Sequence, residues 1–144
     1  MASGLNYVEE IEKCLRDISI IVKKKGREIY SDYSITPPQF EALLILWEYG
    51  NMTIGELSNK MFLAYSTMTD LIDRMEKNNL VKRVRDDRDR RVVHVHLLQE
   101  GIAVIEEVLQ KRQNYLKSVL RNFSKEEIIQ LKNSLKKLQQ EMIE

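Results

Sequence analysis

Residues 65–97 read YSTMTDLIDRMEKNNLVKRVRDDRDRRVVHVHL and decide the fold of this chain. Apolar side chains first recur at helical steps of three and four, at Met68, Leu71, Ile72 and Met75. From residue 81 the period changes to two, over 81–85 and again over 92–97. This change of period predicts an amphipathic helix over about 65–78, followed by a β-hairpin. The linking residues, DDRDRR, include no apolar side chain, so the hairpin tip is highly charged.

Two shorter helices are predicted immediately before this stretch, because each has its own start signal. In Thr36-Pro37-Pro38-Gln39 the threonine and glutamine form a capping box, and the first proline takes the first helical position, where a missing N–H does no harm. Thr53-Ile54-Gly55-Glu56 repeats the capping box and starts a helix that ends near Met61. A short helix, a tight turn, a helix with a polar outer face and a charged hairpin together describe a winged helix-turn-helix.

Long amphipathic segments flank this winged unit on both sides. A helix over about 5–30 precedes it, and Gly26 predicts a bend or fraying there, because glycine costs a helix about 1 kcal/mol. Two helices follow, over about 99–121 and from a third capping box at 124–127 to the end. Their apolar stripes are too large for a small winged helix to cover. A second copy of the chain is the expected partner, and packing within one chain is the alternative.

The expected organisation is therefore one chain, 1–144, in three parts. Residues 35–98 form the winged helix-turn-helix, and residues 5–34 and 99–144 form dimerisation helices. The expected fold class is mostly α, with a small β-hairpin wing.

Composition and charge narrow the function. The 144 residues are 43% hydrophobic and 31% charged, which is typical of one soluble globular domain, and the net charge of +1 requires any basic surface to be local. The longest apolar run, 42–47, is far shorter than the roughly 18 residues that a membrane span needs. A single cysteine and the lack of a signal-peptide pattern favour the cytoplasm. Neither a Gly-rich phosphate loop nor an activated nucleophile is present, so neither an enzyme nor a cofactor is predicted.

Residues 71–101 carry a resemblance to a known family. Three parts of the sequence carry it: Leu71–Val81; Arg83, Asp86 and Asp89-Arg90-Arg91; and Leu97–Gly101. In that order they resemble the recognition-helix end, the wing with an Asp-x-Arg tip and the start of the fifth helix in the MarR family of bacterial regulators. The resemblance extends over nearly the whole chain. It implies a homodimeric, sequence-specific regulator of double-stranded DNA, a repressor on a pseudo-palindromic operator, released by a small aromatic or other anionic effector.

This sequence departs from the family's pattern at four positions. Asn79 stands where glycine is usual, but asparagine also tolerates the left-handed backbone that the turn needs. Ala64 replaces a helix-capping serine, and Leu98 replaces the usual threonine before the fifth helix. Asp70 stands where a basic or polar residue is frequent.

The charged hairpin tip is the first candidate site. Residues 74–91 contain eight basic and four acidic side chains, a local charge of +4. By resemblance, Arg91 enters a narrow minor groove, Asp89 orients its guanidinium, and Arg88 and Arg90 lie near phosphates. The alternative is a solvated hairpin with internal ion pairs.

The outer face of the predicted helix over 65–78 is the second candidate site. A helix in the major groove reads base edges with polar residues near its N-terminus. The candidates for base edges are Ser66, Thr67, Thr69 and Asp70, and those for phosphates are Arg74 and Lys77. Asp70 either accepts from a cytosine amino group or holds a neighbouring basic side chain.

Three further groups of residues have competing interpretations. An effector pocket lined by Tyr30, Tyr33, Trp47 and Met61 competes with ordinary core packing of the same residues. Cys14 is either a redox sensor or an inert small hydrophobe on the apolar stripe of its helix. The only two histidines, 94 and 96, are too few for a metal site, and a solvated or phosphate-facing strand edge is expected for them.

A different class of function remains open at this point. Winged helices also dock proteins, so a protein-interaction module is the rival to a DNA-binding regulator. Salt dependence separates the two, because binding to phosphates weakens steeply as salt concentration rises.

Overall fold

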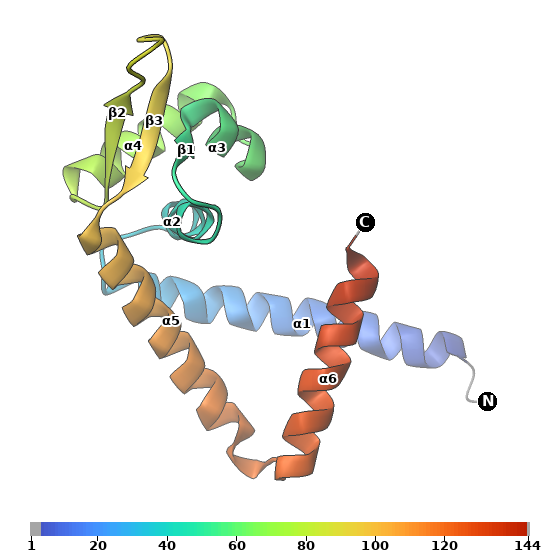
Figure 1. Ribbon diagram of the computed structural model, residues 1–144. Helices are drawn as coiled ribbons and strands as arrows, with labels where there is room; N and C mark the ends of the chain where they lie inside the picture. The colour runs from blue at the N-terminus through green and yellow to red at the C-terminus, as the bar shows by residue number, and fades with distance from the viewer. Residues whose placement is uncertain (1–3, 144) are drawn as a thin grey trace. The chain divides into compact units, whose positions relative to one another are not determined.

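The computed structural model describes residues 4–143 and is mostly helical with one small sheet (Figure 1). The elements in chain order are α1 (Gly4–Ser31), α2 (Pro37–Tyr49), β1 (Met52–Thr53), α3 (Ile54–Met61), α4 (Tyr65–Lys77), β2 (Val81–Arg85), β3 (Val93–Leu97), α5 (Gln99–Val119), a 3-10 turn (Leu120–Asn122) and α6 (Lys125–Met142). The chain forms two compact units that divide within α5, after Leu109. The predicted fold class is confirmed.

Side-chain caps start the helices that the sequence predicts. The capping box at α2 has both halves: the Gln39 N–H donates to the Thr36 hydroxyl, and the Thr36 N–H donates to the Gln39 side chain. The box that starts α6 is equally complete, between Ser124 and Glu127. Local sequence therefore fixes where these two helices begin.

Only half of the capping box predicted for α3 is present. The Thr53 hydroxyl accepts the N–H of Glu56, but the Glu56 carboxylate accepts from that hydroxyl instead of reaching the backbone. Thr53 is also the last residue of β1, and its backbone is paired with His94 in the sheet.

The sheet has three antiparallel strands in the order β1-β3-β2. Strand β1 is only two residues long, Met52 opposite Val95 and Thr53 opposite His94, and the sequence pattern did not reveal it. Its presence makes β3 the central strand, so the prediction that the two histidines lie on a strand edge is wrong. Strand β3 begins at Val93 because Val92 closes the hairpin loop, through bonds to Asp86 and Asp89.

The core of the first unit lies between the helices and one face of the sheet. Its largest fully buried side chains come from α2, α3, α4, β2, β3 and α5, and are Phe40, Leu43, Leu46, Leu57, Met68, Met75, Ile72, Val81, Val95, Ile105 and Val108. Helix α1 contributes its C-terminal end, where Tyr30 stacks on Phe40 with ring centroids 4.9 Å apart. The first half of α5 is thus part of the same core as the winged unit.

Helix α1 continues through Gly26 to Ser31, so the helix does not fray at this glycine. Gly26 is buried, and a Cβ there would meet the ring of Tyr30 at 3.4 Å. Close packing of Tyr30 outweighs the low helix propensity of glycine at this position.

A tight joint connects the end of α4 to the start of α5. Asn79 adopts the expected left-handed conformation, with φ of 60°. The carbonyl oxygen of Leu80 accepts the N–H of Leu98 at 2.9 Å. Gly101 passes so close to this carbonyl that a Cβ would lie 2.4 Å from its oxygen. Only a residue without a side chain fits there.

Two apolar faces lie exposed, one in each unit. On α1 the face consists of Tyr7, Val8, Ile11, Leu15, Ile18 and Ile21. In the second unit it consists of Leu116, Val119, Phe123, Ile128, Leu131, Leu135 and Met142. Among the residues that the structure describes, no helix combines the length and apolarity that crossing a membrane requires.

Candidate nucleic-acid interface

Helix α4 separates an apolar inner face from a polar outer face. Met68, Ile72 and Met75 are buried in the core. The side chains predicted to face DNA and found exposed are Ser66, Thr67, Asp70, Arg74 and Lys77. Thr69 is only half-buried, and its hydroxyl donates to the carbonyl oxygen of Tyr65 at 2.9 Å. Its hydroxyl proton is therefore already in use, and this hydroxyl can serve a further partner only as an acceptor.

No side chain caps the start of α4, because Ala64 occupies the N-cap position. Two exposed aromatic residues flank this start. Phe62 ends α3 in the left-handed conformation, with φ of 54°, and its side chain is 94% exposed. Tyr65 is the first residue of α4 and is also exposed. The sequence interpretation did not single out either aromatic residue.

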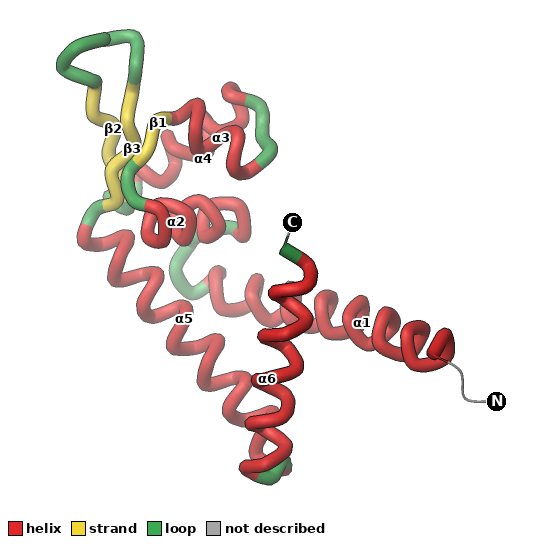
Figure 2. Tube along the Cα trace, turned by 45° about the vertical axis from the view of Figure 1, so that its right-hand side comes forward, coloured by secondary structure: helices red, strands yellow, loops and turns green. Residues whose placement is uncertain are grey.

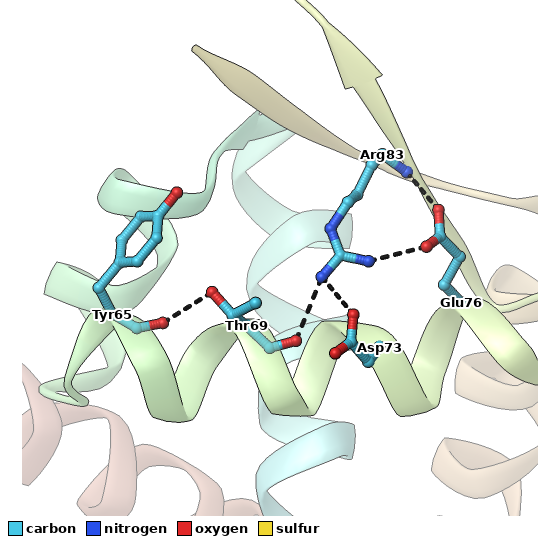
Figure 3. A network of polar contacts seen from close by, with 5 residues as sticks. All are labelled: Tyr65, Thr69, Asp73, Glu76 and Arg83. Carbon is cyan, nitrogen blue, oxygen red and sulfur yellow. Dashed lines mark hydrogen bonds and ion pairs between the residues drawn. The ribbon is translucent and has the colours of Figure 1, made fainter. Parts of the chain in front are cut away.

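Arg83 on β2 lies against α4 and bonds to three of its residues (Figure 3). Its Nη1 donates to Glu76 Oε1 at 2.8 Å, and its Nη2 donates to Asp73 Oδ1 at 2.5 Å and to the Thr69 carbonyl oxygen at 3.2 Å. The backbone N–H of Arg83 donates to Glu76 Oε2 at 2.9 Å. Glu76 therefore holds both the main chain and the side chain of one residue.

The ionisation of Arg83 follows from these contacts. Partial burial alone lowers the pKa of its guanidinium, but the hydrogen bonds and charges of Asp73 and Glu76 outweigh it, so the pKa is raised. Arg83 stays charged and offsets two carboxylates on a helix predicted to face phosphates.

This network corrects the expectation for Asp70. Asp73, one turn further along α4, holds the basic side chain, whereas no ion pair to Asp70 is present within residues 4–143. A signal for the role of Arg83 was present in the sequence. Val81 is buried, and the strand period of two places residue 83 on the same inward face of β2.

The loop between β2 and β3 is a wing tip built on two aspartates. Figure 2 shows it as the long loop that extends beyond the strands. Asp86 Oδ2 accepts the backbone N–H groups of Arg88 and Asp89, at 3.0 and 2.9 Å, and Asp86 Oδ1 lies 3.2 Å from His94 Nε2. The N–H of Asp86 and the carbonyl oxygen of Val92 close the loop at 3.0 Å. These bonds give the charged tip a defined shape.

Asp89 holds Arg91 inside this loop. Asp89 Oδ1 accepts the Nε–H and the backbone N–H of Arg91, both at 3.1 Å, and Oδ2 accepts from Nη2 at 3.2 Å. The Arg91 side chain is nevertheless 92% exposed. Its outward edge is available to a ligand, while its inner edge is fixed.

The other arginines of the wing tip are also exposed, and hydrogen bonds stabilise the ionised forms of Asp86 and Asp89. Arg88 and Arg90 are exposed, and Arg85 Nη1 donates to the Arg90 carbonyl oxygen at 2.8 Å. Hydrogen bonds from the Asp89 N–H, His94 and the Arg88 N–H lower the pKa of Asp86. Hydrogen bonds from the side chain and N–H of Arg91 lower the pKa of Asp89. Both carboxylates are ionised at neutral pH.

The remaining predicted site residues lie in different surroundings. Tyr30 and Met61 are buried in the core, Tyr33 is partly buried against it, and Trp47 is 43% exposed. Cys14 is exposed on α1. No cluster of three or more potential metal ligands occurs within residues 4–143.

Comparison with known proteins gives consistent matches. The model of the MarR family matches residues 35–93. The uncharacterized HTH-type transcriptional regulator YsmB of Bacillus subtilis is 59% identical over 138 residues, which cover 96% of this chain and 94% of that protein. The HTH-type transcriptional repressor MdtR of Bacillus subtilis is 29% identical over 140 residues, covering 97% and 90% of the two chains.

A solved structure extends the match to three dimensions. The structure of a MarR family protein from Bacillus stearothermophilus is 55% identical, covers 98% of this chain and 99% of that chain, and superimposes with a TM-score of 0.88. The winged helix-turn-helix and its wing tip agree with these matches. The chain therefore belongs to the MarR family of transcriptional regulators.

Proposed function

We propose that this protein is a cytoplasmic, homodimeric repressor that binds a pseudo-palindromic DNA operator through α4 and the wing. The observation that carries the proposal is the wing tip, where Asp89 fixes the inner edge of Arg91 and leaves the outer edge exposed. A fixed, exposed arginine at a hairpin tip suits the narrow minor groove, where the potential is most negative. The exposed polar face of α4 suits the adjacent major groove.

Two copies are proposed because apolar surface lies exposed in both units. The faces on α1 and on the second unit consist largely of Ile, Leu, Val and Phe side chains. Contiguous apolar surface of this kind marks an interaction site in soluble proteins. A two-fold dimer presents two α4 helices to half-sites about one helical turn apart, which matches an inverted repeat.

Repression and release are the finer parts of the proposal. The likeness to the repressor MdtR supports repression. Resemblance to the family supports release by a small aromatic or anionic effector. Of the four predicted lining residues, Trp47 has the most exposed side chain, so binding at Trp47 is observable through its fluorescence.

The test is selection of bound duplexes from a random pool, followed by measurement of the affinity for the selected duplex. We expect an inverted repeat and two protein chains per duplex. Arg91→Ala should bind at least about tenfold more weakly, at about 1–3 kcal/mol per good contact. Arg27→Ala is the matched control, because it removes the same charge from an exposed position on α1. Equal losses in the two variants would contradict a specific role for the wing.

The same experiment distinguishes a DNA-binding regulator from a protein-interaction module. A protein-interaction module would select no duplex, and its binding to a protein partner would depend weakly on salt. A duplex selected without an inverted repeat would contradict the dimeric arrangement while leaving DNA binding in place.

A further inference from the structure

Arg83 connects the two elements that are proposed to read DNA. It lies in the middle of β2, three residues before Asp86 starts the wing loop. Its guanidinium bonds to residues 69, 73 and 76 of α4. These positions are four and three residues apart, so the contacts extend about 10 Å along one face of the helix, at about 1.5 Å per residue.

Contacts over this length restrict both the translation and the rotation of α4 against β2. The buried side chains of Met68, Ile72 and Met75 already hold α4 in the core, and the Arg83 contacts add polar restraints between α4 and β2. The Arg83 side chain is only 24% exposed, and two of its three bonds have a carboxylate as the acceptor, although the Asp73 and Glu76 side chains are themselves 52% and 39% exposed. Charge-assisted bonds in a partly buried site are stronger than surface ion pairs. The short turn at 78–80 links the same two elements, through backbone bonds and through the buried side chain of Leu80.

The position of α4 against β2 matters because the two elements face different grooves. β2 continues into the tip that carries Arg91, and α4 carries Ser66, Thr67 and Asp70 on its exposed face. When two contact sites are joined rigidly, binding of one raises the effective concentration of the other. If α4 moves against β2, this gain is lost, although each contact site is intact.

We propose that Arg83 is a positioning residue that makes the wing and α4 bind DNA as one rigid unit, without touching DNA itself. The consequence for DNA binding rests on the proposed function, whereas the connection of α4 to β2 through Arg83 does not. Lysine cannot replace arginine here, because an ammonium group lacks the planar fork that reaches several acceptors at once. The Arg83→Lys variant keeps the charge and removes the geometry.

The first arm of the test is a double-mutant cycle on the selected duplex, with Arg83→Lys, Arg91→Ala and both changes together. Arg83→Lys alone should weaken binding about tenfold, and Arg91→Ala should cost at least fivefold less in that background than in the wild type, because residues that act as one unit are non-additive. Arg85→Lys is the matched control. Arg85 makes one bond, to a carbonyl oxygen, which an ammonium group can also make, so Arg91 should keep its full effect.

The second arm measures amide hydrogen exchange in the free protein. Arg83→Lys loses the contacts between β2 and α4. It should therefore speed amide exchange in α4 and in the wing together, while exchange in α2 stays at the wild-type rate. A general loss of stability would speed exchange in α2 as well. Asp73→Asn, which removes the negative charge but keeps one acceptor oxygen, should produce the same pattern with a smaller change.

The outcomes separate the two proposals. Additive effects of Arg83→Lys and Arg91→Ala, or unchanged exchange in the wing, would overturn the positioning role. If the wild type binds no duplex, the proposed function fails, and the exchange pattern then decides by itself whether Arg83 joins α4 to the wing. Wild-type affinity in Arg83→Lys, with a large loss in Arg91→Ala, would also overturn the inference.

Discussion

Asp89 and Arg91 form a two-pronged pair at the tip of the wing, with Nε to Oδ1 at 3.1 Å and Nη2 to Oδ2 at 3.2 Å. The backbone N–H of Arg91 donates to the same carboxylate. The aspartate therefore restrains both the main chain and the side chain of the arginine. A negative charge beside a proposed phosphate-binding surface would weaken binding by simple electrostatics, so an orienting role for Asp89 rests on its bonds to Arg91.

Replacement of Asp89 by asparagine separates orientation from charge. The change removes a negative charge, and electrostatics alone would strengthen DNA binding. The account predicts the opposite, a loss of about tenfold, because the amide lacks the second acceptor oxygen and the charge that hold the Arg91 guanidinium; a well-made contact of this kind is worth about 1–3 kcal/mol. Fluorescence anisotropy with the selected duplex at one salt concentration measures this.

Asp87→Asn is the control for this change. Asp87 is the neighbouring exposed aspartate, and its substitution alters the net charge by the same amount. It should leave affinity equal or slightly higher. Similar behaviour of the two variants would remove the orienting role from Asp89.

The wing should keep its shape down to unusually low pH. The pKa values of Asp86 and Asp89 are both lowered by hydrogen bonds to their ionised forms. A carboxylate whose pKa is lowered on folding stabilises the folded protein. This stabilisation is fully present above the ordinary pKa of about 3.9 and is lost as the pH falls through the lower pKa of the folded state. In an NMR titration the amide signals of Arg88, Asp89 and Arg91 should therefore report an intact tip until the pH falls below about 3.9. Loss of the tip structure with a midpoint at or above about pH 3.9 would contradict the assignment.

Gly101 should tolerate no side chain. An alanine Cβ would lie 2.4 Å from the backbone oxygen of Leu80, which cannot move without disturbing the joint to Leu98. We expect Gly101→Ala to lower the free energy of unfolding by about 1–3 kcal/mol, the usual range for overpacking. Urea denaturation followed by circular dichroism measures it.

Gly55→Ala gives the opposite expectation under the same measurement. Gly55 lies in the first turn of α3, and the nearest atom to a Cβ there is the Thr53 hydroxyl oxygen at 3.9 Å. Alanine should raise the free energy of unfolding by about 0.4–1 kcal/mol, because it restricts the unfolded chain. A loss in both variants would show that the helices, and not the Leu80 contact, limit what these positions accept.

Phe62 should be replaceable with a gain in stability. It holds a left-handed backbone with φ of 54°, and its side chain is 94% exposed, so little packing is lost on substitution. Asparagine is tolerated in this conformation far better than a bulky residue. Phe62→Asn should raise the free energy of unfolding by roughly 1 kcal/mol. An unchanged or lower value in thermal denaturation would show that the Phe62 ring makes contacts that its exposure hides.

Signals within a few residues made most of the fold predictable. The capping residues Thr36 and Ser124 determine where α2 and α6 begin, because each bonds to a residue three positions away. The bond between Asp89 and Arg91 is equally local, but it was expected from the resemblance to a family. Resemblance to a family supplied the role of the tip, which charge alone did not.

Contacts between distant segments account for what the sequence pattern missed. Strand β1 is two residues long and exists only because it pairs with β3, some forty residues away. Gly26 is accommodated within α1, where the Tyr30 ring packs close to it. The partner of Arg83 depended on the position of α4 against β2, so Asp73 instead of Asp70 was found to hold a basic side chain.

The salt dependence of binding to the selected duplex tests the central claim most directly. The account predicts that log K falls linearly with log salt concentration, with a slope of about −0.9 for each phosphate neutralised, and that the selected duplex keeps about a thousandfold preference over a scrambled one. Binding that is independent of salt, or equal for the two duplexes, would contradict sequence-specific recognition by α4 and the wing.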